Sequence, residues 1–220
     1  MTLLAVITVS LSGCGDNPAG PFDHHRPAEG TRFIYERHRE YVTRGFDTTL
    51  IHELHLEIEE EWNGYEDVYR FLEEDPPDGD NVLMYYANLR YLENGDLRYL
   101  SDQLDDTIYT YDYPFGGGSD TVRTIVETDH EAAWHAATYE GEESIEVDGT
   151  TYTARVVKDY LVAGGDGHSG GAFIMDVTAF YVPELGVVPR LRVEMWTPDD
   201  MGAREKLLVI DTFTLLRIEE

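Results

Sequence analysis

The sequence contains a single cysteine, Cys14, and only two lysines, Lys158 and Lys206, in 220 residues. One cysteine cannot form an intramolecular disulfide, so packing alone must hold the fold. The 44 Asp and Glu residues outnumber the 16 Lys and Arg residues, which gives a net charge of -28. Such a chain repels phosphate backbones and anionic lipid headgroups, which argues against nucleic-acid binding and electrostatic docking onto a membrane. Excess carboxylates with scarce lysine are also typical of a saline habitat, and the sequence leaves that question open.

The sequence also lacks an apolar run of the ~20 residues that a membrane-spanning helix needs. The run Leu3–Leu11 is too short to span a bilayer and is followed by small residues, as in the core of a signal peptide. It ends in Leu11-Ser12-Gly13-Cys14, which resembles the lipobox of bacterial lipoproteins. The resemblance implies that residues 1–13 are a signal peptide and that Cys14 becomes the lipidated N-terminus. The missing Lys or Arg before the run departs from the usual signal, and the alternative is a buried first strand.

Residues 14–30 follow as a predicted flexible tether, because GDNPAGPFDHHRPAEG (residues 15–30) is rich in Gly, Pro and Asp and has no apolar period. A flexible chain of this length spans roughly 20 to 25 Å. His24 and His25 lie in the tether. Two neighbouring histidines could catch a metal, but a solvated loop is the simpler interpretation.

Residues 31–220 are predicted to form one β-rich domain, because alternation of apolar and polar residues recurs between turn signals. In Leu50–Trp62 one face carries His52 and the apolar residues, and the other face carries mostly glutamates. Asn63-Gly64 then predicts a hairpin turn. The predicted fold class is all-β, a large curved antiparallel sheet or half-open barrel, with one short helix as an option.

The optional helix concerns residues 128–139. Thr128-Asp129-His130-Glu131 fits a capping box that opens an Ala-rich helix, but the residues after it fit a strand equally well. The other predicted strands are 65–73, 82–91, 97–100, 107–113, 145–147, 150–162, 173–182, 187–196 and 206–218.

Three spaced segments resemble uncharacterised β-rich envelope lipoproteins of bacteria. They are Gly30–Tyr35, Gly149–Val157 and Tyr181–Val188. The resemblance implies a curved antiparallel sheet, such as the half-open barrel of lipoprotein carriers of the LolA and LolB type. It implies no catalytic residues.

Two stretches imitate active sites. His130 and His135 resemble the zinc metalloprotease box, but they are five residues apart, ~500° of helical rotation, so on a helix they would diverge. The Gly165–Gly171 loop, with His168 and Ser169, resembles a protease nucleophile segment that is interrupted and has no companion histidine motif. A flexible loop is the better interpretation of the second stretch.

Other histidines and acids are weaker candidates for metal ligands. His52 and His55 would lie on opposite faces of a strand, which defeats chelation, and His52 is predicted to be a core histidine bonded to a neighbour. One loop offers weak cation ligands without the register of an EF-hand, so a solvated acidic loop is the default. Its candidate ligands are Asp75, Asp78, Asp80 and Asn81.

The expected function is a noncatalytic binding or structural module, anchored by lipid in the bacterial cell envelope, with no cofactor. No titratable pair stands beside a nucleophile or a metal motif, so we expect no enzyme, with an unrecognised hydrolase as an alternative. The 15 Tyr, 8 Phe and 3 Trp could line a cavity for an apolar ligand, so a carrier of lipid or acyl chains is the other alternative. The partner is therefore an envelope protein or an apolar ligand, and which membrane holds the anchor is undecided.

Lipidation at Cys14 is the first testable prediction. Expressed in a bacterium, the chain should label with fatty acid and partition into detergent, because diacylglycerol and further acyl chains hold a protein durably at a bilayer. The Cys14→Ser variant should lose both properties. A variant that stays equally membrane-bound would show that the anchor is elsewhere.

Overall fold

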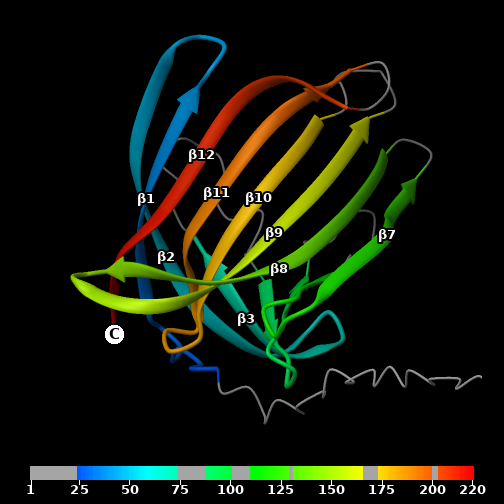
Figure 1. Ribbon diagram of the computed structural model, residues 1–220. Coiled ribbons are helices and arrows are strands. Elements are labelled where there is room, and N and C mark those ends of the chain that lie inside the picture. The colour runs from blue at the N-terminus through cyan, green and yellow to red at the C-terminus, as the bar shows by residue number, and fades with distance from the viewer. Residues whose placement is uncertain (1–23, 74–87, 101–109, 129–130, 166–172, 200–202) are drawn as a thin grey trace, which may run out of the picture.

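The computed structural model describes residues 24–73, 88–100, 110–128, 131–165, 173–199 and 203–220 (Figure 1). Twelve strands and no helix are found in these ranges. The strands are β1 (Arg32–Tyr41), β2 (Phe46–Trp62), β3 (Tyr65–Leu72), β4 (Asn88–Tyr91), β5 (Leu97–Leu100), β6 (Thr110–Tyr113), β7 (Ser119–Thr128), β8 (Glu131–Val147), β9 (Thr150–Gly165), β10 (Phe173–Val182), β11 (Val187–Pro198) and β12 (Arg204–Glu219). None of the described segments forms a helix long and apolar enough to cross a membrane.

All twelve strands belong to one sheet with the order β6-β5-β4-β3-β2-β1-β12-β11-β10-β9-β8-β7. Apart from β6 and β7, each strand pairs antiparallel with its neighbour in sequence, and β1 also pairs with β12, from Arg32↔Glu219 to Tyr41↔Val209. The chain is therefore an up-and-down meander whose first and last strands are joined. Figure 1 shows that the sheet curls into a barrel shape. The predicted fold class, an all-β curved sheet or half-open barrel, is confirmed.

The optional helix at residues 128–139 is absent from the described chain, where β7 ends at Thr128 and β8 begins at Glu131. The alanines of this segment have high helix propensity, but β8 is a central strand with β7 and β9 as neighbours. A central strand satisfies its backbone donors and acceptors on both sides, so tertiary pairing overrides the local preference.

The alternation predicted in β2 is confirmed. His52, Leu54 and Leu56 are buried, whereas Ile51, directly before His52, is half exposed. The turn at Asn63-Gly64 has positive φ at both residues, and so has the turn at Asp148-Gly149. Two consecutive residues with positive φ are what the tight turns of two-residue hairpins require, so these dipeptides fix the register of β2 with β3 and of β8 with β9.

The barrel has its gap between β6 and β7, which follow each other in the chain but lie at opposite ends of the strand order. Side chains fill this seam from the inside. The ring of His135 in β8 lies 4.5 Å from the ring of Tyr111 and 6.0 Å from that of Tyr113, both in β6. Tyr113 and His135 are completely buried. No backbone ladder joins the described parts of β6 and β7. The packing of these rings therefore closes the barrel at this place.

One end of the barrel, called here the proximal end, is formed by residues 24–31 and by the turns at Asp148-Gly149 and Pro183–Gly186. The buried ring of His24 bonds the Tyr181 hydroxyl and, at 3.2 Å, the Leu92 carbonyl. The His25 amide donates to the Pro183 carbonyl at 2.9 Å. Residues 24–30, assigned above to the flexible tether, are therefore packed onto the sheet, and His24 is not a solvated loop residue. The rest of the tether lies outside the described residues.

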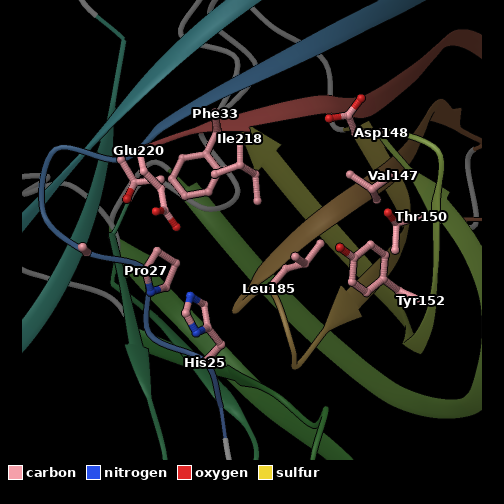
Figure 2. A pocket seen from close by; sticks show the side chains of 12 residues that line it. His25, Pro27, Phe33, Val147, Asp148, Thr150, Tyr152, Leu185, Ile218 and Glu220 are labelled. Atoms are coloured by element: carbon pink, nitrogen blue, oxygen red, sulfur yellow. The ribbon is translucent and has the colours of Figure 1, made fainter.

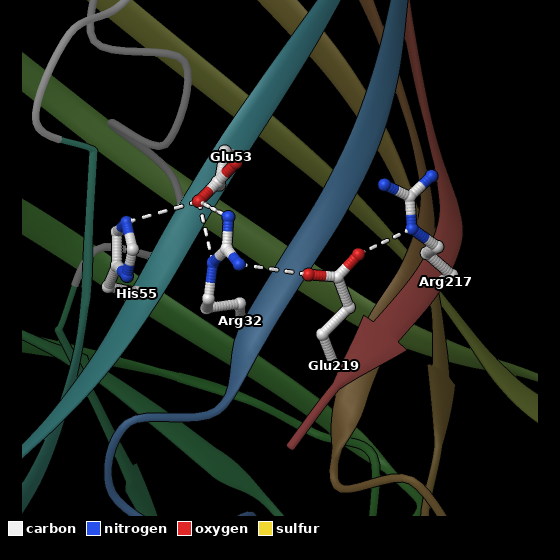
Figure 3. Close-up of polar contacts among 5 residues, drawn as sticks. All are labelled: Arg32, Glu53, His55, Arg217 and Glu219. Atoms are coloured by element: carbon white, nitrogen blue, oxygen red, sulfur yellow. Dashed lines mark hydrogen bonds and ion pairs between the residues drawn. The ribbon is translucent and has the colours of Figure 1, made fainter.

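An ion-pair network crosses three adjacent strands near this end (Figure 3). Arg32 of β1 lies between Glu53 of β2 and Glu219 of β12, and Arg217 holds the other oxygen of Glu219 at 2.7 Å. The hydrogen bond from Arg217, with the charges of Arg217 and Arg32, lowers the pKa of Glu219. These side chains are well exposed, so water and salt screen each pair and its contribution to stability is small. The network orders the outer face but does not hold the fold.

Substitution of Gly186 tests how residues 24–31, called here the N-terminal segment, are held against the barrel. The φ of Gly186 is +67°, and a Cβ added there would collide with the carbonyl of His25, whereas Gly45 has a φ of +69° and open space around it. Gly45→Ala should therefore lower the free energy of unfolding by about 1 to 2 kcal/mol from backbone strain alone. Gly186→Ala should cost about 2 kcal/mol more, because the segment must shift.

Urea denaturation measures both variants, and hydrogen exchange of residues 24–30 should accelerate in Gly186→Ala only. Equal stability losses in the two variants would mean that the segment is not held by this contact.

Candidate functional site

The inner face of the barrel carries three buried polar clusters, two of them pairs of a histidine with a carboxylate. His52 Nδ1 lies 2.7 Å from Glu73 Oε1, and His135 Nδ1 lies 2.8 Å from Asp159 Oδ1. All four side chains are almost completely buried. Buried titratable groups with a charge partner are the usual signs of a functional site, but structural networks show them too.

His52 is the core histidine that the sequence predicts. It is buried on the inner face and bonded to a neighbour, whereas the side chain of His55 is 35% exposed. The two histidines therefore lie on opposite faces of β2, and the predicted core histidine is confirmed. Its partner Glu73 lies just after β3 and could not be found from the sequence, because nothing in the alternation shows which acid turns inward.

His135 belongs to a strand and points at Asp159, so it does not take part in a helical zinc box. His130, its companion in that motif, lies outside the described residues. Burial raises the pKa of the Asp159 carboxyl, and hydrogen bonds and charge from His135, with a smaller contribution from Tyr113, oppose the rise. Asp159 was missed, although an acid at an inward position between Val157 and Leu161 was a visible signal. The pair can exchange a proton, but the His135 ring is completely covered by protein.

The third cluster joins β1 to β12. Asp211 accepts bonds from Arg37 at 3.2 and 3.1 Å and from Arg39 at 2.8 Å on each oxygen. The Arg37 guanidinium also lies 5.3 Å from the Phe213 ring centroid. Two bidentate guanidinium partners saturate the carboxylate, so this cluster is structural.

A pocket of about 300 Å³ opens at the proximal end, at the lower limit of ordinary ligand sites (Figure 2). One wall is the N-terminal segment, and the others come from β1, the β8–β9 hairpin, the β10–β11 turn and the end of β12. It is lined by His25, Pro27, Ala28, Thr31, Phe33, Val147, Asp148, Thr150, Tyr152, Leu185, Ile218 and Glu220. The hydrogen bonds of residues 24–31 hold the first wall in place.

The lining of this pocket has a defined polarity. Phe33, Leu185 and Ile218 form an apolar patch, and Asp148 and Glu220 carry the acidic groups. No Lys or Arg is among the twelve lining residues, and His25 is the only one that can gain positive charge. The pocket therefore suits a group with an apolar body and a cationic or neutral polar end.

Several residues singled out from the sequence cannot be placed. Cys14, the acidic-loop candidates and the loop with His168 and Ser169 all lie outside the described residues. The acidic-loop candidates are Asp75, Asp78, Asp80 and Asn81. In the described ranges no group of three or more His, Cys, Asp or Glu residues is arranged to hold a metal ion.

Comparison with known proteins gives fold-level similarity only. No family model and no curated protein matches the sequence. Among solved structures, a lipoprotein candidate from Parabacteroides distasonis ATCC 8503 is similar with a TM-score of 0.49 and 13% identity over 90% of this chain and 99% of that chain. An exported-protein candidate with a YmcC-like fold from Bacteroides fragilis NCTC 9343 gives a TM-score of 0.40 and 11% identity over 91% of this chain and 100% of that chain.

The raised pKa of Asp159 predicts a pH effect on stability. As pH rises above the ordinary Asp value of 3.8, the carboxyl ionises first in the unfolded chain, so the wild type loses stability until the pH passes the folded pKa. Asp159→Asn has no such ionisation. Urea unfolding between pH 4 and pH 8 should show the variant gaining stability relative to wild type as pH rises.

Asp67→Asn is the control, because Asp67 is an exposed residue of β3. Its stability relative to wild type should stay nearly constant over the same range. A constant difference for Asp159→Asn as well would mean that burial does not govern this carboxyl.

Proposed function

We propose that this chain is an exported, lipid-anchored protein of the bacterial cell envelope that acts as a noncatalytic binding module through its proximal pocket. The observation that carries the proposal is that the segment arriving from Cys14 forms one wall of the pocket. The first described residues after Cys14 thus lie at the same end of the barrel as the pocket. Ten residues link Cys14 to His24, and ten residues span at most ~35 Å, so a lipid at Cys14 keeps the pocket near the bilayer surface.

The chemistry of the pocket indicates the class of partner. Apolar walls with two acidic groups and no Lys or Arg favour an amphiphilic cation over an anion or a plain hydrocarbon. A segment of another envelope protein, with a basic residue beside an apolar one, has this chemistry. The volume of about 300 Å³ is sufficient for one such side chain and its neighbour.

The carrier alternative draws less support from the described interior. Inside the barrel, one apolar cleft has a volume of about 20 Å³. Its lining residues are Tyr35, Leu54, Phe71, Leu89, Val187, Val188, Leu191 and Phe213. That volume is about the room needed for one water molecule, far below that of an acyl chain. Aromatic and aliphatic side chains fill this part of the barrel as core. A lasting anchor also suits a stationary module better than a shuttle.

A noncatalytic role fits the buried pairs as well. His52 and His135 are fully buried, and their acidic partners are hydrogen-bonded or ion-paired inside the barrel. A general acid or base must come within hydrogen-bond reach of its substrate. We therefore assign both pairs to stability of the barrel.

Three probes that share one apolar chain test the pocket. Hexylamine, hexanol and hexanoate carry a cationic, a neutral and an anionic end group, so the full-length protein should bind hexylamine most tightly and hexanoate most weakly. Asp148→Asn should weaken hexylamine about threefold, the size of an exposed ion pair, and leave hexanol unchanged. Ligand-observed NMR titration measures all three affinities.

Glu146→Gln is the matched control, because Glu146 is exposed on the same hairpin, outside the pocket, and the net charge changes equally. It should leave hexylamine binding unchanged. Equal affinity for hexylamine and hexanoate, or equal losses in the two variants, would contradict the proposal.

A further inference from the structure

A second concave site lies on the outer face of the barrel, away from the proximal pocket. It is a wide groove of about 530 Å³ across β8 to β12. Its lining residues are Ala136, Thr138, Glu140, Lys158, Asp159, Tyr160, Asp176, Val177, Thr178, Arg192, Glu194 and Arg204. The Asp159 carboxylate belongs to the interior, where it faces His135, so this residue borders the groove with its backbone.

The sheet register explains how the groove is built. One row of paired residues runs Ala136↔Tyr160↔Asp176↔Glu194, and the adjacent row runs Thr138↔Lys158↔Thr178↔Arg192. The small side chains of Ala136, Thr138 and Thr178 thus lie beside longer side chains of the neighbouring strands. Alanine and threonine leave the floor low, and the long charged side chains and the tyrosine rise as walls.

The charges of the groove balance, which is unusual for a chain with a net charge of -28. Each of its three cations is paired with its own carboxylate. Lys158 lies 3.4 Å from Glu140, and Arg192 bonds Glu194 at 3.0 and 2.8 Å.

The third pair also involves an aromatic ring. Arg204 binds both oxygens of Asp176, and its guanidinium lies 4.8 Å from the centre of the Tyr160 ring. The hydrogen bond to Asp176 raises the pKa of Arg204. The guanidinium and the carboxylate therefore hold each other in fixed positions, each with polar atoms left for a further partner.

We propose that this groove binds a neutral polyhydroxylated chain, that is, a neutral glycan. Carboxylates accept hydrogen bonds from sugar hydroxyls, and guanidinium and ammonium groups donate to them. The hydroxyls of Thr138 and Thr178 on the floor can do both. An anionic ligand meets cations that are already neutralised, and a lipid meets few apolar side chains. This inference does not depend on the proximal pocket.

The test uses the full-length protein and oligosaccharides of glucose, mannose, galactose and N-acetylglucosamine, with oligogalacturonate as the acidic probe. NMR titration should show millimolar or tighter binding of at least one neutral series and weaker binding of the acidic probe. Preference for oligogalacturonate, or no binding of any neutral series at 10 mM, would overturn the proposal.

A matched pair of variants places the binding in the groove. Thr178→Val removes a hydroxyl from the floor and should weaken the neutral glycan about fivefold, the value of one hydrogen bond. Thr212→Val makes the same change in β12, in the same row but outside the groove, and should have no effect. Equal effects of the two variants would show that the glycan binds elsewhere. Asp148→Asn should leave glycan affinity unchanged, which separates this test from that of the proximal pocket.

Discussion

The ladder between β1 and β12 is the constraint on which the rest of the structure depends. It joins the β1–β6 half of the chain to the β7–β12 half, so a twelve-strand meander becomes one continuous sheet. Such long-range pairing is entropically costly and must be supported by side chains. Asp211 of β12 supplies that support on the inner face, because it binds Arg37 and Arg39 of β1 at once. The pairing also brings residues 24–31 to the end of β12, which creates the proximal pocket.

The open seam between β6 and β7 explains why one of the buried polar pairs, His135 with Asp159, lies where it does. A continuous ladder would close the barrel with backbone hydrogen bonds, but here rings must cover the gap. Tyr111 and Tyr113 pack against His135, and the Asp159 carboxylate lies 2.8 Å from the imidazole Nδ1. A buried carboxylate and a buried imidazole are costly without partners, and here each is the partner of the other. The histidine thus supports closure of the barrel by combining a flat ring with a polar edge.

Local features of the fold were predictable from the sequence, and long-range ones were not. Alternation in Leu50–Trp62 and the Asn63-Gly64 turn fixed a hairpin, because period and turn chemistry act over a few residues. The same patterns contain no information on which distant strands pair. They therefore could not reveal that Asp159 faces His135, or that β12 lies beside β1.

The candidate sites were harder still to predict. Both collect residues from strands far apart in sequence, and single positions such as Asp148 or Thr178 look like ordinary turn or surface residues. The packing of His24 escaped prediction for a related reason. The composition of residues 15–30 predicts only the average flexibility of the segment. The single ring of His24, which bonds Tyr181 and Leu92, is enough to hold the end of the segment.

The two sites lie at different positions along β9, so they would lie at different distances from a membrane that holds an anchor at Cys14. The proximal pocket includes the start of β9 at Thr150, and the groove is centred near Lys158 and Tyr160 on the same strand. Eight to ten residues of strand separate them, roughly 25 to 35 Å along β9. With an anchor at Cys14, the pocket would face the bilayer and the groove would look outward. A single rigid sheet could then hold a membrane-side partner and a glycan at a fixed separation, because neither site needs the barrel to change shape.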